Sequence, residues 1–203
     1  MKVLVVTGGI GSGKSEVCRI LHEEYGCGTY DADSRTKELY LKHPTLLSDI
    51  ESSLGESFRD DNGRFCPKSL ARVIFSDRTA LTALENLLFP VLLEDFEIWS
   101  REYQIEPFVV FESATILEKP QLRGFGDIML VVDAPFDIRL NRACSRNGAA
   151  EAEVRARMQN QVLMNRISSG EVPENVDYVI RNTGGLDDLR IQVVEAVGHI
   201  FGN

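Results

Sequence analysis

Five short apolar segments recur along the chain, and between them the apolar residues repeat every three or four positions. Runs rich in Val, Ile, Leu and Phe are typical of strands that are covered on both faces of a sheet. The predicted strands are residues 2–7, 28–31, 108–112, 128–133 and 178–181. Helical periodicity between them favours an α/β fold, in which crossover helices connect the strands of a five-stranded parallel sheet.

The helices that flank this sheet are expected to turn one apolar stripe toward it. The first helix is predicted to begin near Gly13 and to place Val17, Ile20 and Leu21 against the sheet. The last helix is predicted over about 186–201, also with a single apolar stripe.

One long interval, between the second and third predicted strands, breaks the alternation and has a helical pattern almost throughout. Its predicted helices are residues 44–54, 67–75 and 77–103. Pro90 is expected to kink or divide the last of them, because proline removes a helical hydrogen bond. The interval exceeds a simple crossover connection, so we expect a helical subdomain on the acceptor side of a cleft.

The residues from Gly8 to Ser15 read Gly-Gly-Ile-Gly-Ser-Gly-Lys-Ser, which fits G-x-x-x-x-G-K-[ST] directly after a predicted strand. In this pattern, backbone amides at the start of a helix hold a polyphosphate. Lys14 would reach the β- and γ-phosphates, and the Ser15 hydroxyl would ligate Mg²⁺. The residues expected to bind ATP here are Gly9, Gly11, Ser12, Gly13, Lys14, Ser15 and Glu16. The alternative is a glycine-rich turn without a ligand.

Length and charge limit the partners that the chain is expected to have. With 203 residues and a net charge of −9, one domain is expected, and a broad nucleic-acid surface is not. The four cysteines form no C-x-x-C pair and the three histidines have no metal-ligand spacing, so we expect reduced, mostly structural thiols. No stretch approaches the roughly 20 apolar residues of a membrane span, which predicts a cytoplasmic protein without a membrane partner.

The segment Asp31-Ala32-Asp33 follows the second predicted strand, at the carboxyl edge where open α/β sheets bind ligands. Asp33 is a candidate to accept the proton of an acceptor hydroxyl, or to orient that hydroxyl for attack on the γ-phosphate. The alternative is that Asp33 only caps a helix predicted over 34–41. The residues alone favour neither interpretation.

Glu112 ends the third predicted strand. A carboxylate at a strand end beside a phosphate loop can hold a Mg²⁺-bound water. Glu112 is the candidate for this role, and the alternative is a solvated strand end.

Arginines concentrate after the fourth predicted strand, where residues 139–166 contain six arginines and no lysine. Arg139, Arg142 and Arg146 share one face of a helix that Gly148 is expected to end. Guanidinium groups grip phosphate oxygens through two donors at once. We therefore expect a lid that closes over the nucleotide and brings Arg142 and Arg146 to the transferring phosphate.

A second helix of this lid is predicted to begin at about Glu151 and carries Arg157. An ordinary charged helical surface is the alternative for the whole arginine group, and it is the preferred interpretation for Arg155.

The segment from Asn182 to Gly185 follows the fifth predicted strand and precedes the last helix. Asn182 and Gly184 are candidates for the adenine side of the ATP site, and a plain turn with glycines for its geometry is the alternative.

Together, these motifs resemble the dephospho-coenzyme A kinase family over essentially the whole chain. The phosphate loop is shared with many kinases, so the discriminating parts are the aspartate element, the lid and the Asn-Gly segment in this order. The matching parts are residues 7–15, 30–33, 73–77, 84–85, 112–118, 131–135, 157–161 and 177–182, with Gly63, Leu70, Arg142 and Arg146.

The resemblance implies a three-layer P-loop NTPase fold with a helical insertion and a helical lid. Its implied parts are a core over about 1–42, 104–134 and 170–203, an acceptor-binding subdomain over about 43–103 and a lid over about 135–169. The implied reaction is ATP-dependent, Mg²⁺-assisted phosphorylation of the ribose 3′-hydroxyl of dephospho-CoA, the last step of coenzyme A synthesis. The implied partners are these two small molecules, in a monomer or weak homo-oligomer.

The resemblance also implies roles for individual residues. Asp33 looks like the catalytic base, Lys14 and Arg142 look like phosphate stabilisers, and residues 182–184 look like the adenine-side loop. Glu118 and Arg157 are implied on the substrate side, together with Asp33.

Four positions depart from the pattern of the family. Phe89 stands where the family usually has His, Pro67 where Arg is common, Ala114 where Pro is usual and Glu16 where Thr is usual. Losing a His and an Arg from the helical region could alter acceptor binding, because both are potential phosphate or ribose ligands. Two alternatives therefore stay open: a kinase for another small hydroxyl acceptor, such as a nucleoside monophosphate or a sugar acid, and a non-catalytic nucleotide-binding regulator.

Overall fold

The computed structural model describes residues 1–147 and 150–202, with the backbone alone at residues 146 and 147. Its sheet has the strand order β2-β3-β1-β4-β5, and every neighbouring pair is parallel. The strands are β1 (Lys2–Gly8), β2 (Thr29–Asp31), β3 (Phe108–Glu112), β4 (Ile128–Asp133) and β5 (Tyr178–Arg181). The predicted five-stranded parallel α/β fold is therefore confirmed, with strand ends within one residue of those predicted.

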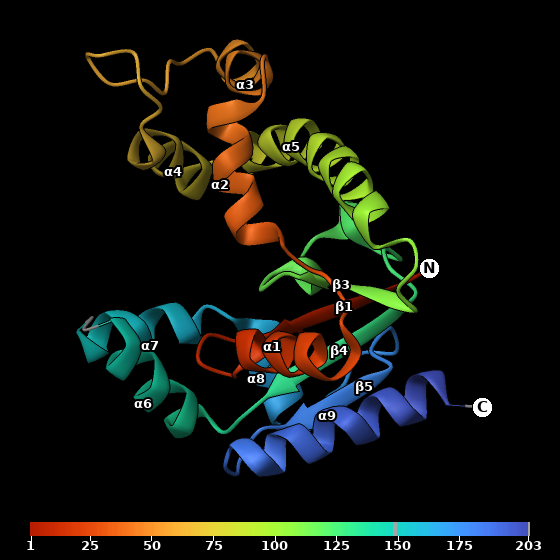
Figure 1. Cartoon of the computed structure of the whole chain (residues 1–203). Coiled ribbons are helices and arrows are strands. Elements are labelled where there is room, and N and C mark those ends of the chain that lie inside the picture. Colours follow the sequence, from red (N-terminus) through yellow and green to blue (C-terminus); the bar gives the residue numbers. More distant parts are fainter. Residues whose placement is uncertain (148–149, 203) are drawn as a thin grey trace. The chain divides into compact units, whose positions relative to one another are not determined.

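Contacts along the chain divide it into two compact units, residues 1–31 with 103–203 and residues 32–102. The first unit contains the sheet and, in Figure 1, its helices are labelled α1 and α6 to α9. Their bounds are α1 (Lys14–Tyr25), α6 (Phe136–Asn147), α7 (Glu151–Gln159), α8 (Val162–Ser168) and α9 (Leu186–Phe201), with short 3₁₀ turns η2 (Ile116–Glu118) and η3 (Pro120–Leu122). A further 3₁₀ turn, η1 (Arg101–Tyr103), spans the point in the chain where the second unit ends. Gly148, the expected end of α6, lies outside the described residues.

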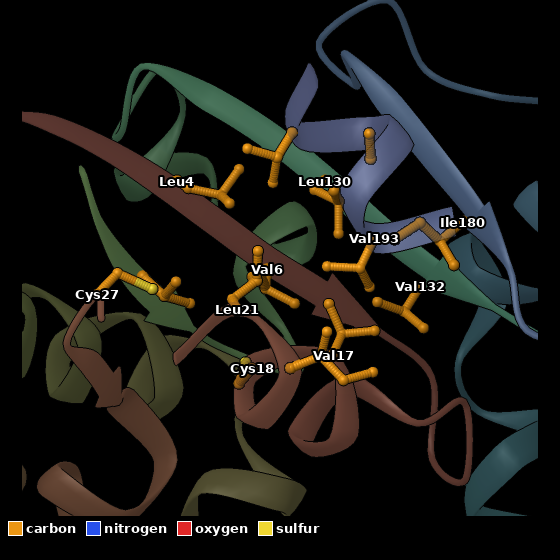
Figure 2. Close-up of a cluster of buried hydrophobic side chains, with 14 of the residues drawn as sticks. Leu4, Val6, Val17, Cys18, Leu21, Cys27, Leu130, Val132, Ile180 and Val193 are labelled. Carbon is orange, nitrogen blue, oxygen red and sulfur yellow. The ribbon is translucent and has the colours of Figure 1, made fainter. Parts of the chain in front are cut away.

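Helices α1 and α9 cover one face of the sheet. Leu130 and Val132 of β4 point to this face, where Figure 2 shows them beside Val17 and Leu21 of α1 and Val193 of α9. Side chains alternate between the faces of a strand, which is why residues two apart share this cluster. The predicted apolar stripe of the first helix is confirmed.

The opposite face of the sheet is covered by α8. Val131, between the two β4 residues of the first cluster, packs there with Met164 and Ile167 of α8. Val179 of β5 joins the same cluster. Because alternate residues of a strand are buried on opposite faces, the strands read as continuous apolar runs in the sequence.

The second unit is helical. It contains α2 (Ala32–Lys42), α3 (Leu46–Leu54), α4 (Pro67–Ser76) and α5 (Arg78–Ser100). Helices α2, α3 and α4 each pack against α5. Asp77 caps α5, because its carboxylate accepts a hydrogen bond from the backbone N–H of Thr79 at 2.7 Å.

Pro90 does not divide α5, which continues from Arg78 to Ser100. An interior proline disfavours a helix by about 3 kcal/mol. Burying Leu84, Leu88 and Leu92 along the same helix offsets this, since each buried leucine contributes about 1.5–3 kcal/mol. Of the two outcomes expected at Pro90, division of the helix was wrong, because packing that local propensity does not include holds the helix together, and a kink stays a prediction.

All four cysteines carry free thiols, Cys18 and Cys27 in the core and Cys66 and Cys144 partly exposed, as expected for a reduced protein. Within the described residues, none of the helices combines the length and the apolar character that crossing a bilayer requires.

We expect Leu21→Ala to lower the free energy of unfolding by about 2–5 kcal/mol, because it opens a cavity where α1 packs on the sheet. Ile191→Ala is the matched control, since Ile191 lies on α9 with 58% of its surface exposed. Urea denaturation of both variants checks this, and equal losses would contradict the assignment of Leu21 to the core.

Candidate functional site

The loop from Gly8 to Gly13 connects β1 to α1 and is tightly turned. Gly11 and Gly13 have φ values of 73° and 100°, a left-handed conformation that glycine adopts without strain. The backbone N–H of Ser12 donates to the carbonyl of Gly9 at 3.1 Å, and α1 begins at Lys14. The loop therefore ends at the positive pole of a helix, where phosphates bind.

Neighbouring atoms leave no room for a side chain at the glycines of this loop. A Cβ atom at Gly11 would lie 2.1 Å from the carbonyl oxygen of Arg139, and one at Gly13 would lie 2.3 Å from Nδ2 of Asn182. Within the part of the chain that the structure describes, the N–H groups of Gly11 and Gly13 donate no hydrogen bond. These two amides therefore suit the phosphate oxygens of a nucleotide.

One loop amide has a partner from a distant segment. The N–H of Ile10 donates to Oε1 of Gln161, immediately before α8, at 2.9 Å. The region predicted as a lid is thus joined to the loop by a hydrogen bond.

Lys14 and Ser15 occupy the first turn of α1. The Lys14 ammonium lies 3.5 Å from the carbonyl oxygen of Gly9, so its side chain folds back along the loop. The hydroxyl of Ser15 donates to Oε1 of Glu112, at the end of β3, over 3.2 Å. The structure therefore places the predicted phosphate lysine, metal hydroxyl and acidic strand end together.

Burial raises the pKa of Glu112 above its ordinary value, and the nearby charge of Asp31 raises it further, whereas Lys14 and the Ser15 hydroxyl oppose them. A cation would relieve this unfavourable burial of negative charge. The described residues contain no group of three His, Cys, Asp or Glu side chains that could hold a metal alone. The oxygen ligands of Ser15 and Glu112 fit Mg²⁺, which usually binds through few protein oxygens and completes its shell with phosphates and water.

Asn182 connects the loop to α6. Its Nδ2 donates to the carbonyl oxygen of Ser12 at 2.8 Å. Arg142 donates to Oδ1 and to the backbone oxygen of Asn182, each at 3.3 Å. Asn182 is 4% exposed, so water does not replace these bonds and the guanidinium of Arg142 is fixed relative to the loop.

Two adjoining cavities extend from the loop. The first, about 300 Å³, is lined by Ile10, Gly11, Gly13, Lys14, Ser15, Glu16, Arg142 and Ala143. The second, about 250 Å³, is lined by Gly13, Glu16, Arg142, Asn182, Gly184, Gly185, Leu186 and Leu189. Both share Gly13, Glu16 and Arg142, so the two cavities meet at the start of α1. The first suits a polyphosphate, and the second, with an apolar wall, suits a base.

Glu16 lies at the junction of these cavities, where a carboxylate would repel phosphates. Its side chain pairs with Arg19, one turn along α1, and Arg19 also pairs with Glu23. The arginine therefore offsets the charge that Glu16 brings to the nucleotide site.

Asp33 belongs to the helical unit and is exposed in the first turn of α2. The helix predicted over 34–41 begins at Ala32, so Asp33 is helical itself and does not occupy the N-cap position. The role of Asp33 as a base stays a prediction.

Three further predicted residues lack a described place at the loop. Glu118, in η2, lines a cavity that shares no lining residue with the phosphate-loop cavity, and burial raises the pKa of its carboxyl. Arg157 is exposed on α7. The side chain of Arg146 lies outside the described residues. Their functional roles stay predictions.

Arg139 is a residue at the loop that the sequence analysis did not assign to the site. Its side chain is 1% exposed and packs against Gly9, whereas Arg142, three residues later, lines both cavities. The i, i+3 spacing put both on one side of α6, but it carried no signal that Arg139 is buried.

Comparison with known proteins identifies the family that this chain resembles. The model of a family described as dephospho-CoA kinase matches residues 2–188. A dephospho-CoA kinase from Chlorobaculum tepidum is 38% identical over 194 residues, which cover 93% of this chain and 89% of that protein. One from Aquifex aeolicus is 28% identical over 193 residues, covering 95% and 94%.

A crystal structure of a Thermus thermophilus protein has the same fold. It is 27% identical, with a TM-score of 0.80, and the match covers 100% of this chain and 98% of that one.

We expect Asn182→Ala to lower the free energy of unfolding by about 1–3 kcal/mol, because it leaves the buried carbonyl of Ser12 without its donor. Asn175→Ala, at an exposed position, is the control and should change stability by less than about 0.5 kcal/mol. Chemical denaturation measures both, and an unchanged Asn182→Ala variant would show that the loop does not depend on this bond.

Proposed function

Because the chain belongs to the dephospho-CoA kinase family, we propose that it transfers the γ-phosphate of ATP to the ribose 3′-hydroxyl of dephospho-CoA, giving CoA and ADP. The observation that carries this proposal is one cavity in which the phosphate loop, Lys14, Ser15 and Arg142 meet. A site built in this way binds the donor and stabilises charge, which is most of what phosphoryl transfer requires.

On the donor side, the loop amides would hold the β- and γ-phosphates, with the adenine in the cavity beside Asn182 and Gly184. The ammonium of Lys14 and the guanidinium of Arg142 would face the oxygens that gain negative charge as the bond from the γ-phosphorus to the bridging oxygen breaks. Asn182 holds Arg142 in advance, so little reorganisation is needed at the transition state.

Ser15 and Glu112 would hold Mg²⁺, Ser15 through its hydroxyl and Glu112 through a bound water. When bound, the ion neutralises charge on the β- and γ-phosphates. The cation would also offset the negative charge of the half-buried Glu112 carboxylate, which lies near the charge of Asp31.

On the acceptor side, Asp33 follows β2 by two residues, so the chain itself keeps it near the carboxyl edge of the sheet. Its carboxylate would take the proton of the 3′-hydroxyl as the hydroxyl oxygen bonds to the γ-phosphorus. Glu118 and Arg157 are proposed to contact the acceptor, and the helical unit is proposed to form its pocket.

The decisive experiment incubates the purified protein with ATP, Mg²⁺ and dephospho-CoA and follows CoA by mass spectrometry. AMP, shikimate and gluconate are the competing acceptors, since related P-loop kinases phosphorylate small hydroxyl compounds. Formation of CoA supports the proposal, whereas phosphorylation of another acceptor with dephospho-CoA untouched would overturn it. ATP binding without any transfer would favour a regulator.

We expect Asp33→Asn to lower kcat by about 10²–10⁴-fold with little change in ATP affinity, because the amide cannot accept the hydroxyl proton. Asp49→Asn, at an exposed position in α3, is the matched control in the helical unit and should keep its activity. Steady-state kinetics and ATP titration measure both. Near-normal turnover of Asp33→Asn would exclude Asp33 as the base.

We expect Glu112→Gln to raise the Mg²⁺ concentration for half-maximal activity at least about tenfold, because a neutral amide holds the metal-bound water less strongly than a carboxylate. Glu195→Gln, exposed on α9, is the control. Initial rates over a Mg²⁺ titration at saturating ATP check this, and superimposable curves would remove Glu112 from the metal site.

A further inference from the structure

A positive charge is buried against the phosphate loop. The side chain of Arg139 is 1% exposed, although arginine is rarely buried without a partner. A Cβ atom at Gly9 would lie 2.4 Å from Nη1 of Arg139, so the guanidinium rests directly on the loop backbone. Arg139 is not among the residues that line the phosphate-loop cavity, whereas Ile10 and Gly11 of the same loop line it.

The guanidinium has few hydrogen-bond partners. Its Nη2 donates to Oδ1 of Asn165 over 3.5 Å, a long bond to a neutral group. Within residues whose side chains the structure describes, Nε and Nη1 have no acceptor. Burial accordingly lowers the pKa of Arg139 from its ordinary value, and the charge of Asp133 opposes this.

Asp133 does not form an ion pair with Arg139. Its Oδ1 accepts a hydrogen bond from Ser168, and its Oδ2 accepts one from Arg181. Both carboxylate oxygens thus have other donors, and the charge of Asp133 acts on Arg139 without a direct ion pair.

Two hydroxyl groups of the same region are also unsatisfied. Within the described part of the chain, the side-chain oxygens of Thr7 and Ser12 are buried and have no hydrogen-bond partner. The loop and its support therefore contain several buried polar atoms that are unfavourable in the ligand-free protein.

We propose that Arg139 is a positioning residue of the phosphate loop, whose buried charge is compensated by the polyphosphate that binds on the other side of the loop. This inference rests on the proposed nucleotide site and adds a second cation to it, one that never touches the ligand. The guanidinium packs against Gly9, and Ile10 and Gly11 of the same loop line the cavity. Little water screens the two charges, so their attraction is stronger than at a surface.

A positioning role for Arg139 predicts a different combination of stability and polyphosphate affinity than direct phosphate binding does. An uncompensated buried charge destabilises the ligand-free protein, and replacing such a group by an apolar one of similar size is often neutral or stabilising. Loss of Arg139 should therefore weaken polyphosphate binding without weakening the fold. A merely structural arginine would show the reverse, with lower stability and unchanged affinity.

The test compares the full-length protein with Arg139→Met, Arg139→Gln and Arg139→Lys. Binding of tripolyphosphate and of ATP, each with Mg²⁺, is measured by calorimetry, and Tm is measured with and without these ligands. Arg166→Gln is the matched control, because it also removes one arginine charge but at an exposed site on α8.

We expect Arg139→Met and Arg139→Gln to bind tripolyphosphate at least about tenfold more weakly than the unmodified protein, with a ligand-free Tm that is unchanged or higher. Arg139→Lys, which keeps the charge, should recover a large part of the affinity, and Arg166→Gln should bind normally. In CoA formation, the loss should appear mainly in KM for ATP.

The inference is overturned if the Met and Gln variants bind within about twofold of the unmodified protein, or if Arg166→Gln loses as much affinity. It is also overturned if the ligand-free Tm falls while the Tm increase on ligand binding is unchanged. If Arg139→Met does not fold, the comparison of Arg139→Lys with Arg139→Gln tests the inference. Equal affinities of these two variants for tripolyphosphate would exclude a role for the charge. Tripolyphosphate binding does not require an acceptor substrate. Failure to form CoA would therefore reject the proposed reaction without changing the result of the binding test for Arg139.

Discussion

The backbone from Gly8 to Lys14 lies directly against polar side chains from two later parts of the chain, and no side chain fits between them. Asn182 holds the carbonyl of Ser12 from the loop after β5, and Arg139 reaches Gly9 and Gly11 from α6. The loop cannot form this cradle by itself. The conformation of the loop therefore requires β1, α6 and the end of β5 to be in place around it. The glycines allow this close packing and also allow the chain to turn sharply.

This constraint explains how a chain with a net charge of −9 can offer a site for polyphosphate. In the proposed site, the positive potential does not come from the general surface. It comes from a helix start, two backbone amides and the side chains of Lys14 and Arg142, with Arg139 packed against Gly9. Even the carboxylate of Glu16 is paired within its own helix.

Much of the sheet could be predicted, because strands buried on both faces leave unbroken apolar runs such as 128–133. The phosphate loop was predicted from glycine spacing and Lys14 for an equally local reason. Predictions from local sequence failed where packing with distant segments determines the structure. Helix α5 continues through Pro90 without being divided, and Arg139 is buried although a charged helix face is usually exposed to solvent. The bond between Ser12 and Asn182 spans 170 residues, and no pattern within a single segment contains it.

The position of β1 between β3 and β4 also has a consequence for how the protein is made. Residues 8–15 are synthesised before their packing partners, because both neighbours of β1 come from beyond residue 107 and Asn182 comes later still. Contacts of such long range form late, because the intervening chain must first be closed into a loop. A nascent or truncated chain that ends before β5 therefore carries the complete glycine motif without the packing that shapes it. Nucleotide binding in this protein is therefore expected to depend on the segment after β5 as much as on the glycine motif itself.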